Sequence, residues 1–551
     1  MAGIGIWVSG FVHLGCTWRR SIVESQNFKI CHANGIDAAL VCAGASIAPC
    51  HNDGVTRAMM HNEIAPGEPE SDRFARVSSA LRILMVVTFL FMGLKIIRYG
   101  YLPPGDVLRD AAQAMTGKPF TDVIVMFPGY TMNHNPGWDW FLRQLHVKAG
   151  MGEDQLVAFA IVSMLLWLLC IPLLWFRCPD AWLATLLLFN LTLPWLMSRF
   201  TQARPLLFTE GVLIALLLTW RGGGNPSWLK ILLTSAGFAL AVWMHGTWFL
   251  WALLPAAFFL AGQWRAGISL TLCWIAGTLL GVMLTGRPFE SLRQSIVIAL
   301  TVSREQVPAL LTVGELQSSE GEFSVLLILG LMFVWRRGKL DEQLRSPLFW
   351  MMVICWLLGL TAGRFWVDWG LPAALVWMAL QMEEVVLASW SARPGRRMLA
   401  GGLMALALFL LTTSDAEGRY TNMLREPFTD LSAPELKGWA PGKGGIFYGA
   451  DMSFFYNTFY KNPEGDWRYI VGFEPAWMPP DDLKIFRTIQ WSQFAYKAYE
   501  PWARKMRPQD RLEISSGSQP NVPPLEWINA GNNIWIGRLP EIQPAFTRKG
   551  K

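Results

Sequence analysis

Two acidic residues, Asp106 and Asp110, lie one helical turn apart after the first long apolar segment of the chain. They occur in YLPPGDVLRDAAQAMTGKPF, where Pro-Pro-Gly predicts a turn and VLRDAAQAM predicts a helix with Asp106 as its N-cap. An N-cap carboxylate is stabilised by free backbone N–H groups, which is a purely structural role. The same position also suits a general base, with Asp110 on the same helix face. Both interpretations are open for Asp106.

Histidines are sparse beyond residue 61 of the chain. Only three follow, His134, His146 and His245, and the first two occur in or near the stretch GYTMNHNPGWDWFLRQLH. Each could be a structural hydrogen-bonding group or a ligand contact. The same stretch contains Asp139, which together with Asp106 and Asp110 could supply oxygen ligands to a divalent metal such as Mg²⁺ or Mn²⁺. The sequence leaves the metal requirement undecided.

Three arginines occupy very short connections between apolar segments. Arg199 and Arg204 lie in SRFTQARP, and Arg364 lies in GRFWVDWG. A guanidinium donates two parallel hydrogen bonds to a phosphate, so these residues are candidate phosphate ligands. Snorkelling to lipid headgroups is the alternative. Glu210, in FTEGVL, is expected inside a spanning helix, where a carboxylate is costly and is usually functional or paired, and Arg204 is a possible partner.

The elements that carry these residues are predicted to be membrane-spanning helices. The chain has 551 residues, of which 52% are hydrophobic and 16% charged, well below the roughly 25% charge of soluble domains. A span needs about 20 apolar residues. We expect about eleven helices, over 80–98, 155–176, 181–198, 205–220, 228–244, 246–262, 266–284, 323–335, 347–363, 369–388 and 398–413. Some of them are short enough to be tilted, re-entrant or merged.

The basic residues of the short loops predict the orientation of these helices. If residue 80 is cytoplasmic, five alternate loops carry an excess of Lys and Arg, as the positive-inside rule requires. Residues 99–154, 285–322 and 414–551 are then outside. All the candidate histidines and arginines fall on that external side. The net charge of +6 therefore indicates membrane orientation, and it is no sign of nucleic-acid binding.

The two ends of the chain differ from its middle. Residues 1–75 form a poorly defined segment, and the true initiator could be Met59 or Met60. Residues 76–413 are expected to form the membrane domain, and 414–551 a small soluble α/β domain. In that domain GIFYGADMSFFY predicts a strand with a Gly turn, and WINAGNNIWIGRL a hairpin with Asn and Gly at its turn. The spacing of the eight cysteines predicts neither a disulfide framework nor a zinc site.

Together these motifs resemble the GT-C superfamily of integral-membrane glycosyltransferases. The resemblance rests on Asp106 after the first span, on NHNPGWDWFLRQLH before the second, on Ala203-Arg204-Pro205 opening a later helix, and on RFWVDWGLP. In architecture it extends over residues 80 to about 390 and resembles the protein mannosyltransferase and aminoarabinose transferase families. The family more often has a paired acidic dipeptide or His-Pro-Pro where this chain has Gly105-Asp106 and His134-Asn135-Pro136.

The resemblance implies an enzyme that uses a polyprenyl-phosphate sugar. By that resemblance Asp106 deprotonates the acceptor, and Arg204, Arg364, Arg199 and His245 hold the departing phosphate. The expected enzyme is a multi-pass hexosyl- or pentosyltransferase of the bacterial inner membrane, with its C-terminus outside and a glycan, lipid or protein as acceptor. The alternatives are a polysaccharide polymerase or ligase, a transporter or flippase, and a non-catalytic assembly protein.

Overall fold

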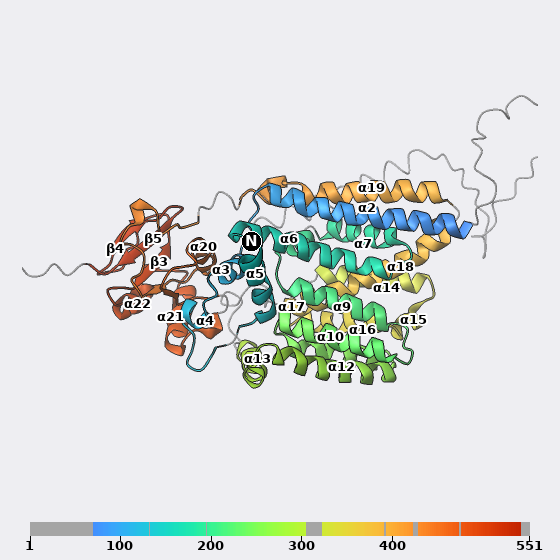
Figure 1. Ribbon diagram of the computed structural model, residues 1–551, viewed down its shortest axis with the longest axis horizontal. Helices are drawn as coiled ribbons and strands as arrows, with labels where there is room; N and C mark the ends of the chain where they lie inside the picture. The colour runs from blue at the N-terminus through green and yellow to red at the C-terminus, as the bar shows by residue number, and fades with distance from the viewer. Residues whose placement is uncertain are drawn as a thin grey trace, which may run out of the picture. The chain divides into compact units, whose positions relative to one another are not determined.

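The computed structural model describes residues 70–131, 133–193, 195–304, 322–390, 393–422, 428–472 and 475–540 (Figure 1). Most of the segment 1–75, and with it the prediction about the initiator, lies outside the described residues. The described chain is mainly helical, with one small mixed sheet near its C-terminus. This confirms the predicted combination of apolar helices with a small α/β region.

Among the described residues, five helices are long and apolar enough to cross a membrane, and they indicate a multi-pass membrane protein. They are α2 (Glu70–Arg98), α6 with η1 (Glu153–Cys170 and Ile171–Leu174), α12 (Trp264–Met283), α17 to α18 (Gly363–Phe365 to Leu371–Trp390) and α19 (Pro394–Thr413). The pair α7 (Pro179–Thr192) and α8 (Trp195–Thr201) is bent by 112° and could be a sixth. Shorter apolar helices are α9 (Leu206–Trp220), α10 (Trp228–Met244), η2 with α11 (Trp248–Ala252 and Leu253–Leu260), α14 (Glu322–Arg336) and α16 (Pro347–Gly359).

Each predicted span overlaps one of these apolar helices. Helices α2 and α19, which are far apart in the sequence, lie side by side, as Figure 1 shows. The number of complete crossings stays a prediction, because several of the helices are shorter than the roughly 20 residues that a full span needs. The orientation derived from the loop charges also stays a prediction.

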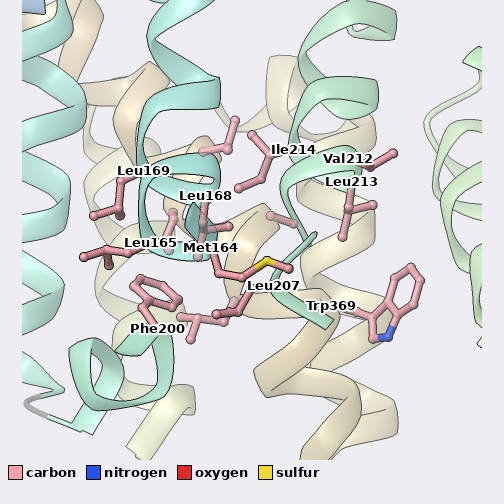
Figure 2. Packing of buried hydrophobic residues seen from close by; sticks show 14 of the residues in the cluster. Met164, Leu165, Leu168, Leu169, Phe200, Leu207, Val212, Leu213, Ile214 and Trp369 are labelled. Carbon is pink, nitrogen blue, oxygen red and sulfur yellow. The ribbon is translucent and has the colours of Figure 1, made fainter. Parts of the chain in front are cut away.

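The core of the bundle lies between α6, α8, α9 and the short π-helical turn η4 (Trp366–Gly370). Figure 2 shows buried leucines where α6 and α9 lie close together, and Phe200 and Trp369 belong to the same cluster. Gly211 permits this approach, because a Cβ there would lie 2.1 Å from Nε1 of Trp167. The indole ring of Trp167 lies against Gly211, and its N–H donates to the Phe208 carbonyl of α9 at 3.1 Å. The small residue thus brings α6 and α9 close together.

The segment between the first two spans carries α3 (Asp106–Thr116), α4 (Phe120–Val123) and α5 (Pro136–Ala149). The helix predicted over VLRDAAQAM is present, but the N-cap prediction for Asp106 was wrong. Gly105 is the N-cap, with φ 104° and no side-chain capping bond, and Asp106 is the first helical residue. A positive φ of this size favours glycine. The Asp106 carboxylate is therefore not used to cap the helix.

The C-terminal sheet has the strand order β2-β1-β3-β5-β4. The strands are β1 (Ile446–Tyr448), β2 (Arg468–Tyr469), β3 (Arg511–Ser515), β4 (Glu526–Asn529) and β5 (Ile534–Arg538), with α20 (Met452–Lys461), α21 (Pro480–Trp491) and α22 (Glu500–Lys505) beside them. Strands β2, β1 and β3 are parallel, whereas β3, β5 and β4 are antiparallel. The hairpin prediction is confirmed. The strand predicted over GIFYGADMSFFY ends at Tyr448, and MSFFY begins α20 instead.

The segment after the first span is joined to this sheet. Ile124 forms a parallel bridge with Tyr469 of β2. The backbone N–H of Val125 donates to the Tyr469 carbonyl at 2.9 Å, and that of Phe127 donates to the Trp477 carbonyl at 2.8 Å. A shared apolar cluster joins the two regions, and it includes Ala112, Phe120, Val123, Ile124, Phe454, Phe455 and Phe459. The loop and the C-terminal region therefore have one continuous core.

Candidate functional site

Asp106 and Arg204 face each other where the first long loop meets the start of α9. The Arg204 Nε atom lies 3.9 Å from Asp106 Oδ2, and their side chains are 20% and 24% exposed. Asp106 Oδ1 lies 3.1 Å from Nη1 of Arg109, one helical turn along α3. The Tyr456 hydroxyl of α20 donates to the same oxygen at 3.4 Å. A partly exposed carboxylate is thus bordered by two guanidinium groups and a phenol.

The charges around Asp106 keep it ionised. Burial by itself would raise its pKa, but the positive charges of Arg109, Arg204 and Arg364 outweigh that effect and lower the pKa to about 2. Burial raises the pKa of Tyr456 well above its ordinary value, and the negative charge of Asp106 adds to this. The phenol therefore stays protonated and can donate to the carboxylate. Asp106 is an anion at any working pH.

Arg109 links the two acidic residues that the sequence pointed to. Its Nε and Nη2 atoms donate to Asp110 Oδ1 at 2.9 and 2.6 Å. The Asp110 side chain is 0% exposed, and its Oδ2 atom has no hydrogen-bond partner among the described residues. Burial raises the pKa of Asp110 well above its usual range, and the nearby carboxylates Asp139 and Asp106 add to this. Asp110, predicted to be catalytic, has no access to a substrate here and holds Arg109 instead.

Asp139, the third carboxylate, is also buried. It accepts a hydrogen bond from Asn133 Nδ2 at 2.7 Å, and burial raises its pKa to about 6 even though Arg109 opposes this. Within the described ranges, no group of three His, Cys, Asp or Glu residues is arranged to hold a metal ion. The Arg109 guanidinium instead contacts both Asp106 and Asp110. The arrangement of the described residues therefore does not support the expectation that these carboxylates bind a divalent metal.

His134 and His245 come together, although they are far apart in the sequence. The Gly246 N–H donates to the His134 carbonyl at 2.9 Å, and His245 Nδ1 lies 3.0 Å from the Thr247 hydroxyl. Burial lowers the pKa of each imidazole to about 3, and Arg364 contributes to this at His245. Both rings are neutral at physiological pH. His245 can therefore donate a hydrogen bond to a phosphate, but it carries no charge to neutralise one.

His146 lies apart from the Asp106 contacts. Its Nδ1 atom lies 2.8 Å from the Met151 carbonyl at the end of α5. This local contact is typical of a structural histidine at a helix C-terminus.

Arg199 and Arg364 meet at a buried acid that the sequence analysis did not single out. Arg199 Nη2 donates to Asp368 Oδ1 at 2.5 Å, and Arg364 Nε donates to Asp368 Oδ2 at 3.1 Å. Asp368 therefore neutralises part of the charge that a phosphate would meet. The Arg364 side chain is 39% exposed and the more accessible of the two arginines.

Glu210 is buried inside the bundle, as predicted for a carboxylate on a spanning helix. Its carboxyl group has no ion-pair partner among the described residues, and the ion pair found for Arg204 is with Asp106. The possible pairing of Glu210 with Arg204 is therefore not formed.

Sequence reasoning missed three residues of this region, Arg109, Asp368 and Tyr456. Arg109 could have been found, because it lies three residues after Asp106 on one helix and such residues are neighbours. Asp368 could also have been found, since it lies four residues after Arg364. Tyr456 lies 350 residues from Asp106, and no local pattern indicates their contact.

The comparisons with known proteins find similarity in structure but not in sequence. No protein-family model matches the chain, and no curated protein matches its sequence. Among solved structures, the crystal structure of ArnT from Cupriavidus metallidurans, bound to undecaprenyl phosphate, is similar with a TM-score of 0.48 and 12% sequence identity. The match covers 83% of this chain and 97% of that chain.

Proposed function

We propose that this protein is a glycosyltransferase that moves a sugar from a polyprenyl-phosphate donor to a hydroxyl group of an acceptor at the membrane surface. The observation that carries the proposal is the pair of partly exposed side chains, Asp106 and Arg204, 3.9 Å apart. Asp106 follows the long apolar helix α2, and Arg204 directly precedes the apolar helix α9. This arrangement supports the proposal, because the proposed proton acceptor and the proposed phosphate ligand would act together at the end of apolar helices, where a lipid phosphate would be found.

The transfer needs one proton acceptor and one site for the leaving group. In the proposed step the acceptor oxygen forms a bond to the anomeric carbon while the bond from that carbon to the phosphate oxygen breaks. The acceptor proton goes to Asp106. The phosphate leaves with the bonding electrons and gains one negative charge, which Arg204 and Arg364 stabilise. The neutral His245 imidazole adds a hydrogen bond.

The donor itself would strengthen the base. With no phosphate present, the surrounding arginines hold the pKa of Asp106 at about 2, which makes the carboxylate a weak base. A phosphate that binds Arg204 and Arg364 neutralises two of those positive charges, and the pKa of Asp106 must then rise. Asp106 would therefore accept a proton most readily when the donor is in place.

The test compares two site variants with two matched controls. Membranes that contain Asp106→Asn or Arg204→Gln are assayed for transfer from a panel of polyprenyl-phosphate hexoses and pentoses. We expect each variant to lose transfer, by about 10²–10⁴-fold for Asp106→Asn, because that change removes the general base. Asp122→Asn, an exposed acid of the same loop, and Arg293→Gln, whose side chain is 65% exposed, should retain activity.

Two results would contradict different parts of the proposal. If Asp106→Asn and Arg204→Gln both retain full transfer at normal abundance, these residues are not the site. If the unaltered protein consumes none of the lipid-linked sugars, the assignment as a glycosyltransferase fails.

A further inference from the structure

A second polar site lies at the C-terminal end of α9, whereas Arg204 lies before the start of that helix. It is a cavity of about 560 Å³, lined by residues from the ends of α9 and α18, from the start of α16, and from α15 (Leu340–Leu344). Arg204 precedes α9, whereas Arg221 of the cavity follows it. The 15 residues of α9 span about 22 Å at 1.5 Å per residue. The cavity is therefore separate from the proposed catalytic region.

The charges around this cavity favour an anion. Its lining includes Arg177, Arg221 and Arg345, which are exposed and have no ion-pair partner among the described residues. The three acids of the lining already have partners.

Each of those acids has a defined contact. Glu384 binds Lys339 Nζ at 2.6 Å and Arg337 Nη2 at 3.2 Å, and Glu342 lies 3.8 Å from Lys339. Glu383 accepts the Cys178 backbone N–H at 2.9 Å. Glu342 and Glu384 are thus paired with cations, whereas Glu383 keeps its negative charge because a backbone N–H is neutral. The three arginines outnumber this one acid, so the lining keeps an excess of positive charge.

The inner part of the cavity combines a polar group with an apolar surface. Gln381 is 5% exposed, and its Oε1 atom has no hydrogen-bond partner in the described part of the chain. The adjacent Gln343 is satisfied, because its Oε1 accepts from Trp377 Nε1 at 2.7 Å. Leu348, Leu380 and Leu387 also line the cavity. Such a surface suits a ligand with a charged group, a hydroxyl-bearing portion that can meet Gln381, and an apolar portion.

We propose that this cavity binds the phosphate-bearing headgroup of an anionic membrane lipid. The phosphate is held by Arg221 and Arg345, whose guanidinium groups suit its geometry, with Arg177 close by. A glycerol hydroxyl of the headgroup donates to Gln381 Oε1, and the start of the acyl chains lies against the leucines. Basic pockets between spanning helices are a known mode of binding for anionic headgroups. A lipid is favoured over a soluble anion because the cavity lies at the ends of apolar helices and has an apolar wall.

The test measures lipid-dependent thermal stability of the full-length protein in dodecyl maltoside. Phosphatidylglycerol, phosphatidylcholine and inorganic phosphate are titrated separately. We expect phosphatidylglycerol alone to raise the melting temperature in a saturable manner. The double variant Arg221→Gln/Arg345→Gln should weaken the apparent affinity at least ~100-fold, since two charge-assisted contacts are lost. Arg336→Gln/Arg396→Gln, two exposed arginines outside the cavity lining, should leave the affinity unchanged.

Several outcomes would overturn the proposal. Equal stabilisation by phosphatidylcholine would show that any lipid suffices, and equal stabilisation by inorganic phosphate would indicate a site for a soluble anion. An unchanged affinity in the Arg221/Arg345 double variant would show that the cavity is not the binding site. If that variant does not fold, Gln381→Leu provides the test, because it keeps the volume and removes the amide. An unchanged phosphatidylglycerol affinity in Gln381→Leu would then overturn the proposal, and a weakened one would support it.

Discussion

Removal of the buried Arg109 should strongly destabilise this protein. It is 2% exposed and contacts two carboxylates, the fully buried Asp110 at 2.6 Å and the more accessible Asp106 at 3.1 Å. Arg109→Met keeps most of the side-chain volume but leaves Asp110 without its cation. Breaking a buried ion pair from one side costs about 3–5 kcal/mol, because the remaining charge is buried and uncompensated. We expect a loss of that size in the free energy of unfolding.

The double variant Arg109→Met/Asp110→Asn distinguishes the cost of losing the ion pair from the cost of leaving the Asp110 charge without a partner. A neutral amide in place of Asp110 removes the uncompensated charge and leaves at most an unsatisfied polar group, which costs about 1–3 kcal/mol. The double variant should therefore be more stable than Arg109→Met. Unfolding is followed by tryptophan fluorescence as dodecyl sulfate is added to dodecyl maltoside micelles. Arg293→Met, with a side chain 65% exposed, is the control and should change stability by less than about 0.5 kcal/mol.

The pH dependence of Arg109→Met follows from the same reasoning. Burial already raises the pKa of Asp110, and loss of Arg109 must raise it further. A carboxyl group with a raised folded-state pKa contributes stability below its unfolded pKa of about 4, and this contribution is lost as the pH rises through the folded value. The destabilisation relative to the unaltered protein should thus grow as the pH rises above the folded-state pKa that Asp110 has beside Arg109. A loss below about 1 kcal/mol at pH 7, or a double variant no more stable than the single one, would refute this account of the pair.

Three further changes test other parts of the structure. Burial raises the pKa of Asp139 to about 6 in the folded protein. As the pH rises from about 4 to 6, the unaltered protein should therefore lose up to about 3 kcal/mol of stability relative to Asp139→Asn. Unfolding titrations at each pH measure this difference. Gly105→Ala should destabilise the protein by about 1–3 kcal/mol in the same assay, because the backbone φ of 104° at this position is strained for alanine. The control Gly402→Ala should not destabilise it, because Gly402 lies in helix α19 with open space where a Cβ would lie. Phe455→Ala should lower the free energy of unfolding by about 3–5 kcal/mol, because the ring is fully buried between α3 and the sheet. The control Phe494→Ala should lower it much less, because Phe494 is half-exposed. Equal losses in the two variants would contradict the shared core.

The apolar helices could be predicted from sequence because the property that defines them is local. A run of apolar residues is visible without any knowledge of its neighbours, and each predicted span overlaps a helix. The late hairpin is local as well, since Gly531, Asn532 and Asn533 all adopt the positive φ that its turn requires. The start of α3 was misplaced by one residue because an acidic residue and a glycine can both occupy an N-cap position.

The site was only partly accessible to the same reasoning. The sequence predicted that Asp106, Arg204, Arg364 and His245 would be near one another, and the structure brings them close enough that Arg204 and Arg364 lower the pKa of Asp106. Their catalytic and phosphate-binding roles stay predictions. Whether each group is buried or already paired depends on packing between distant segments, which is why the partner of Arg199 and the burial of Asp110 could not be predicted.

The C-terminal region helps to hold the loop that carries Asp106 in position. Helix α3 has 11 residues, which is too short for an isolated helix to be stable in water. One side of it, including Val107, Leu108 and Ala111, packs in the apolar core of the helix bundle, and Ala112 packs in the cluster shared with α20. The direction of the Asp106 carboxylate is therefore fixed from two sides, by Arg109 and Arg204 next to the bundle and by Tyr456 of α20. Any change that separates α20 from α3 must also alter the hydrogen bonding and the position of the proposed base.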